Sequence, residues 1–214
     1  MLIQYLIAGR YLTFMAVAVT LLTAIALHEF GHAAAATAQG DRGPKLAGRL
    51  TLNPLVHLDP VGTFMLFLSP FGWGKPVQFT PRSLRNPRAG VTIVALAGPA
   101  MNVLLAILGA FALAVFRPEG FGNVLGLEMV RWNAMLAVFN LIPIPPLDGS
   151  RILTVLLPPN RQHVLFFLDK WGILLLLGIV FLFREPLAAV INLVGVSILR
   201  MFGLDYLTAP GGIF

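Results

Sequence analysis

Residues 12–38 read LTFMAVAVTLLTAIALHEFGHAAAATA, an apolar stretch interrupted only by two histidines and a glutamate near its end. No charged residue, glycine or proline occurs between Leu12 and Leu27. A helix over residues 12–38 would be about 40 Å long, whereas the hydrocarbon core of a bilayer is about 30 Å thick. The stretch therefore predicts a membrane-spanning helix, which we expect to stop before Gly40.

The composition of the whole chain supports this interpretation. The 214 residues are 57% hydrophobic and only 11% charged, whereas soluble domains are typically about 25% charged. Most of the surface must therefore face lipid, and the length suits one membrane-embedded domain over residues 1–214. The net charge of +6 would suggest nucleic acid in a soluble protein. We expect no nucleic-acid partner, because membrane proteins collect Lys and Arg in cytoplasmic loops.

Further apolar segments predict an all-α polytopic membrane protein with about five to six transmembrane helices. The predicted spans after the first are residues 90–116, 124–142, 164–183 and 187–203. Residues 90–160 would carry the second and third spans, residues 161–203 the two C-terminal spans, and residues 204–214 a tail.

Residues 39–89 differ in kind and predict a cytoplasmic or re-entrant loop region. They hold seven of the fifteen Lys and Arg residues and seven prolines. Short strands over Leu46–Leu52 and Val77–Phe79 would form a β-hairpin within residues 41–80, and Asp59 would cap a short helix that begins at Pro60. An exposed edge at Leu46–Leu52 could hold an unwound substrate by β-augmentation.

The excess of basic residues in this loop predicts its side of the membrane. By the positive-inside bias, residues 39–89 lie in the cytoplasm. Five spans would place residues 143–163, with Arg151 and Arg161, on the same side. We therefore expect the N-terminus outside, the C-terminus inside and the active site toward the cytoplasm.

The pentapeptide His28-Glu29-Phe30-Gly31-His32 has the HExxH pattern. On a helix, positions i and i+4 share one face, so both imidazoles can bind one Zn²⁺ while Glu29 acts as general base toward a water molecule. Charged and polar side chains inside a membrane helix are costly, which argues for use rather than chance. The alternative is that both histidines merely pack at a helix–helix interface.

Because the chain has no cysteine, any further ligand must be His, Asp or Glu. Asp148 follows the proline-rich run Asn140-Leu-Ile-Pro-Ile-Pro-Pro-Leu147, whose broken backbone is tolerated at membrane depth only inside protein or along a cavity. We predict Asp148 as the third ligand of a site with one open position. It could equally cap the helix that follows, and the two roles are compatible.

These separated motifs, taken in order, resemble those of the site-2 protease family. They are HEFGH, the AGPAMN segment at Ala97–Asn102 and NLIPIPPLDG at Asn140–Gly149. The runs GRLTLNPLVHLDPVGT (Gly48–Thr63) and FGWGKPVQFTP (Phe71–Pro81) resemble its compact prokaryotic branch without a PDZ domain. The resemblance implies a zinc endopeptidase in a prokaryotic cell membrane that cuts transmembrane segments of protein substrates, with one zinc per chain held by His28, His32 and Asp148.

Two more residues are candidates for the catalytic site. The family's matching asparagine lines the active site, so Asn140 could hold the substrate backbone or the developing oxyanion; a helix–helix hydrogen bond is the alternative. His57 could approach the metal, or could be a loop residue bonded to a backbone carbonyl. We expect Gly98 to serve close helix contact, and Asn102 to bond toward the broken backbone near Pro143.

Two other functions remain open on the sequence alone. A membrane metal-ion binding or transport protein would use the same ligands, but the related halves frequent in transporters are not visible and Glu29 would be unexplained. A catalytically inactive binder of membrane segments is a further possibility, against which the intact HExxH and Asp148 argue.

Overall fold

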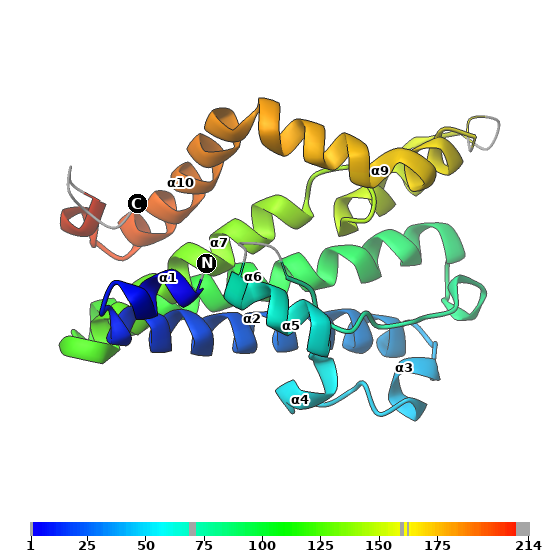
Figure 1. Ribbon diagram of the computed structural model, residues 1–214. Helices are drawn as coiled ribbons and strands as arrows, with labels where there is room; N and C mark the ends of the chain where they lie inside the picture. The colour runs from blue at the N-terminus through cyan, green and yellow to red at the C-terminus, as the bar shows by residue number, and fades with distance from the viewer. Residues whose placement is uncertain (1, 69–71, 159–160, 162, 209–214) are drawn as a thin grey trace.

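The computed structural model describes residues 2–68, 72–158, 161 and 163–208, and these are predominantly helical (Figure 1). The long helices are α2 (Tyr11–Ala38), α6 (Pro87–Phe116), α7 (Gly120–Asn140), α9 (His163–Leu182) and α10 (Arg184–Met201). The short ones are α1 (Leu2–Ile7), α3 (Gly43–Leu46), α4 (Pro54–His57), α5 (Pro60–Leu68) and α8 (Leu153–Leu156). The 3₁₀ turns that lie wholly within the described residues are η1 (Pro81–Ser83), η2 (Asp148–Ile152) and η4 (Asp205–Thr208).

Helices α2, α6 and α7 form the centre of the molecule and alternate in direction. His28 and His32 of α2 contact Asn102 and Val94 of α6, in that order, so these two helices are antiparallel. Asn102 also contacts Asn133 of α7, and Gly109 approaches Gly126, so α6 and α7 are antiparallel as well. Helices α2 and α7 therefore run in the same direction, and their C-terminal ends lie on the same side.

The ends of these helices follow from local sequence. Asn86 caps α6, because its side-chain oxygen accepts hydrogen bonds from the N–H groups of Arg88 and Ala89, and Pro87 occupies the first helical position. Helix α2 ends at Ala38, and Gly40 follows with a positive φ of 110°. The predicted stop before Gly40 is confirmed.

Among the described residues, three helices are long and apolar enough to cross a membrane: α2, α6 and α9. Helices α7 and α10 overlap the predicted spans 124–142 and 187–203. They are not among the helices that are long and apolar enough to cross a membrane. The polar residues of α7 include Glu128 and Asn133, both buried inside the protein. The prediction of five to six transmembrane helices is therefore not confirmed. The described residues contain three helices that are long and apolar enough to span a membrane.

The predicted strands are wrong for the loop region that the structure describes. Residues Leu46–Leu52 contain the end of α3 and a turn at Gly48, with φ of 70°, and Asn53 then caps α4. Pro44 and Pro54 stand within the first positions of these helices, which favours helical turns over a strand. Val77–Phe79 is not a strand either, and a lone antiparallel bridge joins Leu58 to Gly74. The β-augmentation hypothesis at Leu46–Leu52 loses its basis.

Two other details of the predicted organisation can be compared with the structure. The Asp59 side chain accepts a 2.8 Å hydrogen bond from the Gly62 N–H and α5 begins at Pro60, so the predicted cap is confirmed. Helices α9 and α10 lie on one side of the central three, and Gly172 of α9 is close to the Pro145 carbonyl (Figure 1). Of the predicted tail, residues 209–214 lie outside the described residues.

Candidate metal centre

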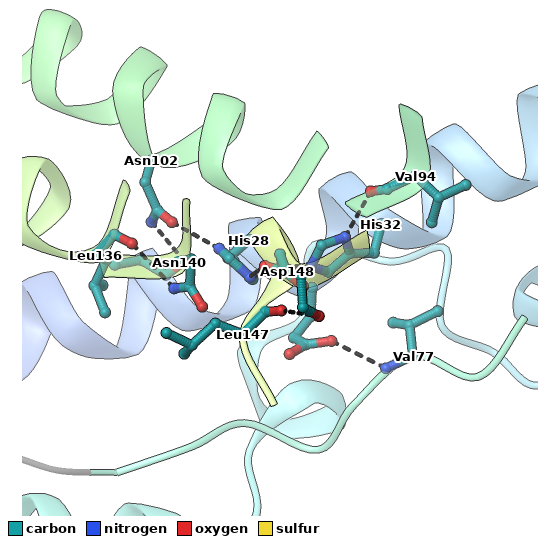
Figure 2. Close-up of polar contacts among 12 residues, drawn as sticks. His28, His32, Val77, Val94, Asn102, Leu136, Asn140, Leu147 and Asp148 are labelled. Atoms are coloured by element: carbon teal, nitrogen blue, oxygen red, sulfur yellow. Dashed lines mark hydrogen bonds and ion pairs between the residues drawn. The ribbon is translucent and has the colours of Figure 1, made fainter. Parts of the chain in front are cut away.

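Three side chains from two separate elements converge on one point (Figure 2). Helix α2 supplies His28 and His32, and η2 supplies Asp148 at its first residue. The two Nε2 atoms are 3.0 Å apart, and the Asp148 Oδ2 atom lies 3.0 Å from His28 Nε2 and 3.3 Å from His32 Nε2. Within the described part of the chain, these residues form the group of His, Asp and Glu that can hold a metal ion.

The broken backbone after α7 places Asp148 here. Residues 141–147 leave the helix as a series of turns, and η2 begins directly afterwards. The Ser150 hydroxyl donates to the Leu147 carbonyl, and a Cβ atom at Gly149 would lie 2.3 Å from the Leu141 carbonyl oxygen. The chain can fold back this tightly because residue 149 is glycine.

The second nitrogen of His32 fixes its tautomer. His32 Nδ1 lies 2.8 Å from the Val94 carbonyl oxygen of α6. A carbonyl oxygen can only accept, so Nδ1 carries the hydrogen. Nε2 consequently presents its lone pair to the centre, as metal-binding histidines do.

A chain of side-chain amides fixes His28 in the same way. The Asn133 amide nitrogen donates to the Met129 carbonyl, so its oxygen accepts from the Asn102 amide nitrogen at 3.0 Å. The Asn102 oxygen therefore faces His28 Nδ1, 2.7 Å away, and Nδ1 must donate. His28 Nε2 is left as an acceptor. Asn102 and Asn133 are both fully buried, so little water competes with this chain.

The converging atoms fit a cation. Two imidazole lone pairs and a carboxylate oxygen face one another, and Asp148 Oδ2 is buried without a hydrogen-bond partner among the described residues. The neighbouring Gly98 leaves this centre open, since a Cβ atom there would lie 2.4 Å from His32 Nε2 and 2.7 Å from His28 Nε2. Two imidazoles and one carboxylate with space beside them are the ligand set of catalytic zinc sites.

Glu29 follows the ligand His28 in α2 and is oriented by the loop that follows α5. Its Oε2 atom accepts a 3.0 Å hydrogen bond from the Val77 N–H. The loop is itself fixed on both sides of Val77. The Lys75 N–H donates to the His57 carbonyl, and the Thr80 N–H donates to the buried Asp41 carboxylate.

The other two predicted catalytic residues lie at different distances from the centre. Asn140 is beside it in Figure 2, and its amide nitrogen donates to the Leu136 carbonyl of its own helix at 3.0 Å. The fully buried His57 imidazole lies 2.8 Å from the Thr51 carbonyl oxygen and does not join the converging ligands. The His57 carbonyl accepts a hydrogen bond from the Lys75 N–H, which connects His57 to the loop that carries Val77. The catalytic roles of Asn140 and His57 stay predictions.

Sequence reasoning missed the residues that orient the ligands. Asn102 was expected to bond near Pro143, yet its contacts are His28, Asn133 and the Ala24 carbonyl. The sequence did contain a feature that could have predicted this pair. Asn102 and Asn133 are polar residues inside apolar segments, where each needs a hydrogen-bond partner within the protein. Gly98 was expected to allow close helix contact, which is confirmed, and the contact is with the ligands themselves.

A HExxH helix with an aspartate third ligand, set among membrane-length apolar helices, defines a membrane metalloprotease. The model of peptidase family M50 matches residues 16–128. The chain belongs to this family, the site-2 protease family, and it is a zinc metalloprotease.

Relatives with similar sequences carry corresponding names. The chain is 35% identical over 198 residues to the "Putative zinc metalloprotease YwhC" of Bacillus subtilis (strain 168), covering 86% of this chain and 89% of that protein. It is 34% identical over 176 residues to the "Putative zinc metalloprotease Rip2" of Mycolicibacterium smegmatis, covering 72% of this chain and 62% of that protein. No solved structure matches the chain.

Proposed function

We propose that this protein is an intramembrane endopeptidase that hydrolyses peptide bonds in or near transmembrane segments of membrane proteins. The observation that supports this most strongly is the depth of the ligands along α2. His32 and His28 precede the last residue of this helix by about 9 Å and 15 Å, at 1.5 Å per residue. A helix of 28 residues is about 42 Å long, about 12 Å more than a ~30 Å bilayer core. His28 therefore falls at membrane depth even if all of this excess lies at the C-terminal end, and His32 does so when part of the excess lies at the N-terminal end.

The family and the donor set give each residue a role. When bound, zinc supplies a Lewis acid that polarises the substrate carbonyl and makes water more acidic. The Glu29 carboxylate takes a proton from the attacking water and later delivers it to the leaving amine. The Val77 N–H holds Oε2 of Glu29 in place, which leaves Oε1 to exchange the proton. Asn140, beside the ligands, donates toward the substrate backbone or the developing oxyanion.

We further propose that one zinc ion binds per chain and that the site opens toward the cytoplasm. One cluster of three ligands supports the first point, within the residues that the structure describes. The orientation rests on the excess of Lys and Arg in residues 39–89. These residues directly follow the C-terminal end of α2, which is the end nearer to the ligands.

Placing one cleavable sequence in two contexts tests the intramembrane preference. A labelled peptide is presented as a transmembrane helix in proteoliposomes, and the same residues are presented in a soluble, unstructured fusion protein. We expect cleavage of the membrane-embedded form and little or none of the soluble form. Faster cleavage of the soluble form in the same vesicles would contradict an intramembrane protease while leaving a zinc protease intact.

A further inference from the structure

A cavity that none of the metal ligands lines lies at the C-terminal end of α2. Its volume is about 600 Å³, and it is lined by the end of α2 and by the segments that follow α2 and η1. Its charged lining residues are Arg42, Lys45 and Arg85. All three side chains are exposed, and no ion pair joins any of them to an acidic group of the described chain.

The positive charge of this cavity exceeds what the fold requires. The C-terminal end of a helix carries about half a negative charge, which one nearby cation more than balances. The carboxylate nearest in sequence, Asp41, is buried and accepts hydrogen bonds from the N–H groups of Gly43 and Thr80. The cavity therefore has an unbalanced positive charge suited to an anion with several acceptor oxygens, such as a phosphate group.

An exposed leucine among these cations indicates the source of the phosphate. Leu46 lines the cavity and is 84% exposed. Cations beside an exposed leucine, at the end of a membrane-length helix, match the boundary between lipid headgroups and acyl chains. A dissolved phosphate would leave Leu46 in water, whereas a phospholipid would cover it.

We propose that this cavity binds the phosphate headgroup of an anionic phospholipid. Arg42, Lys45 and Arg85 contact the phosphate, and Leu46 contacts the upper part of an acyl chain. The site is separate from the metal centre and does not depend on the proposed intramembrane cleavage. A lipid held here would fix the depth at which α2, and with it the ligand pair, sits in the membrane.

Lipid binding to matched variants tests this proposal. The protein in an uncharged detergent is titrated with phosphatidylglycerol or phosphatidylcholine, and bound lipid is counted by native mass spectrometry. We expect the wild type to retain one phosphatidylglycerol and to release phosphatidylcholine. The Arg42→Gln/Arg85→Gln variant should bind phosphatidylglycerol at least tenfold more weakly. Arg82→Gln is the control, because Arg82 is exposed in the same loop but does not line the cavity.

Two further arms separate the possible sources of phosphate. Leu46→Asn should weaken phosphatidylglycerol binding, and inorganic phosphate in large excess should not displace the lipid. Zinc content equal to wild type shows that each variant is folded. Equal weakening by Arg82→Gln, or no retained lipid in the wild type, would overturn the proposal. Displacement by inorganic phosphate, with Leu46→Asn binding normally, would assign the cavity to a soluble phosphate instead.

Discussion

At the scale of single residues, the metal centre depends on side chains that never touch the metal. Val94 and Asn102 fix the tautomers of His32 and His28, and Asn133 fixes the orientation of Asn102. Partners of this kind typically contribute tenfold to a hundredfold to metal affinity. The ligands alone therefore do not account for the strength of the site.

Replacing Asn102 with alanine should lower zinc affinity by about tenfold to a hundredfold, because His28 loses the acceptor that holds its Nδ1–H. Competition with a zinc chelator measures the change. Asn192→Ala, at an exposed asparagine of α10, is the control and should bind zinc as the wild type does. Equal affinity in both variants would show that the amide chain has no part in metal binding.

Gly98→Ala should abolish zinc binding. The new Cβ atom would lie 2.4 Å from His32 Nε2, where the lone pair needs free space. Gly178→Ala is a matched control inside another helix, since a Cβ atom there meets nothing within 4 Å. Zinc per chain, measured by atomic absorption, distinguishes the two. Full zinc content in Gly98→Ala would contradict the proposed position of the metal.

The sequence alone was enough to predict which three side chains converge, but not the residues that orient them. The spacing of His28 and His32 places them on one face of a helix. Asp148 was predicted because it directly follows a proline-rich run whose broken backbone must lie inside the protein or along a cavity. The Asn102–His28 contact joins residues 74 positions apart, and no local pattern encodes such a pairing. It depends on how α2 and α6 pack, which becomes visible only in three dimensions.

At the scale of elements, the loop that follows α5 is part of the active site. Hydrogen bonds to His57 and Asp41 hold it, and its Val77 N–H binds Glu29. The sequence predicted a β-hairpin within residues 41–80, with strands over Leu46–Leu52 and Val77–Phe79. The first strand did not form because Pro44 and the Asn53 cap with Pro54 start short helices on both sides of it.

Val77→Pro should lower kcat/KM by about tenfold to a hundredfold, because proline has no N–H and a hydrogen bond to a charged group contributes about 1.5–3 kcal/mol. Val77→Ala keeps the N–H and should retain wild-type activity. Zinc content should be unchanged in both variants. Normal turnover by Val77→Pro would show that Glu29 is positioned without the loop.

At the scale of the whole molecule, charge predicts the orientation in the membrane. The chain has no cysteine, so single cysteines can be introduced without a background. Ser83→Cys lies in the basic loop region and Glu119→Cys lies between α6 and α7, and both positions are exposed. In intact cells, a membrane-impermeant thiol reagent should label position 119 and not position 83. The reverse pattern would invert the orientation proposed here.

Activity of the whole molecule should depend on the three ligands and on Glu29 together, as in a zinc-dependent protease. The most direct measurement is cleavage of a panel of labelled transmembrane peptides by wild type and Glu29→Gln, each with and without a zinc chelator, alongside zinc content. We expect the wild type to cleave and to lose this activity on chelation, while Glu29→Gln retains zinc and cleaves at least about a hundredfold more slowly. Equal cleavage by zinc-loaded Glu29→Gln and wild type would contradict the account.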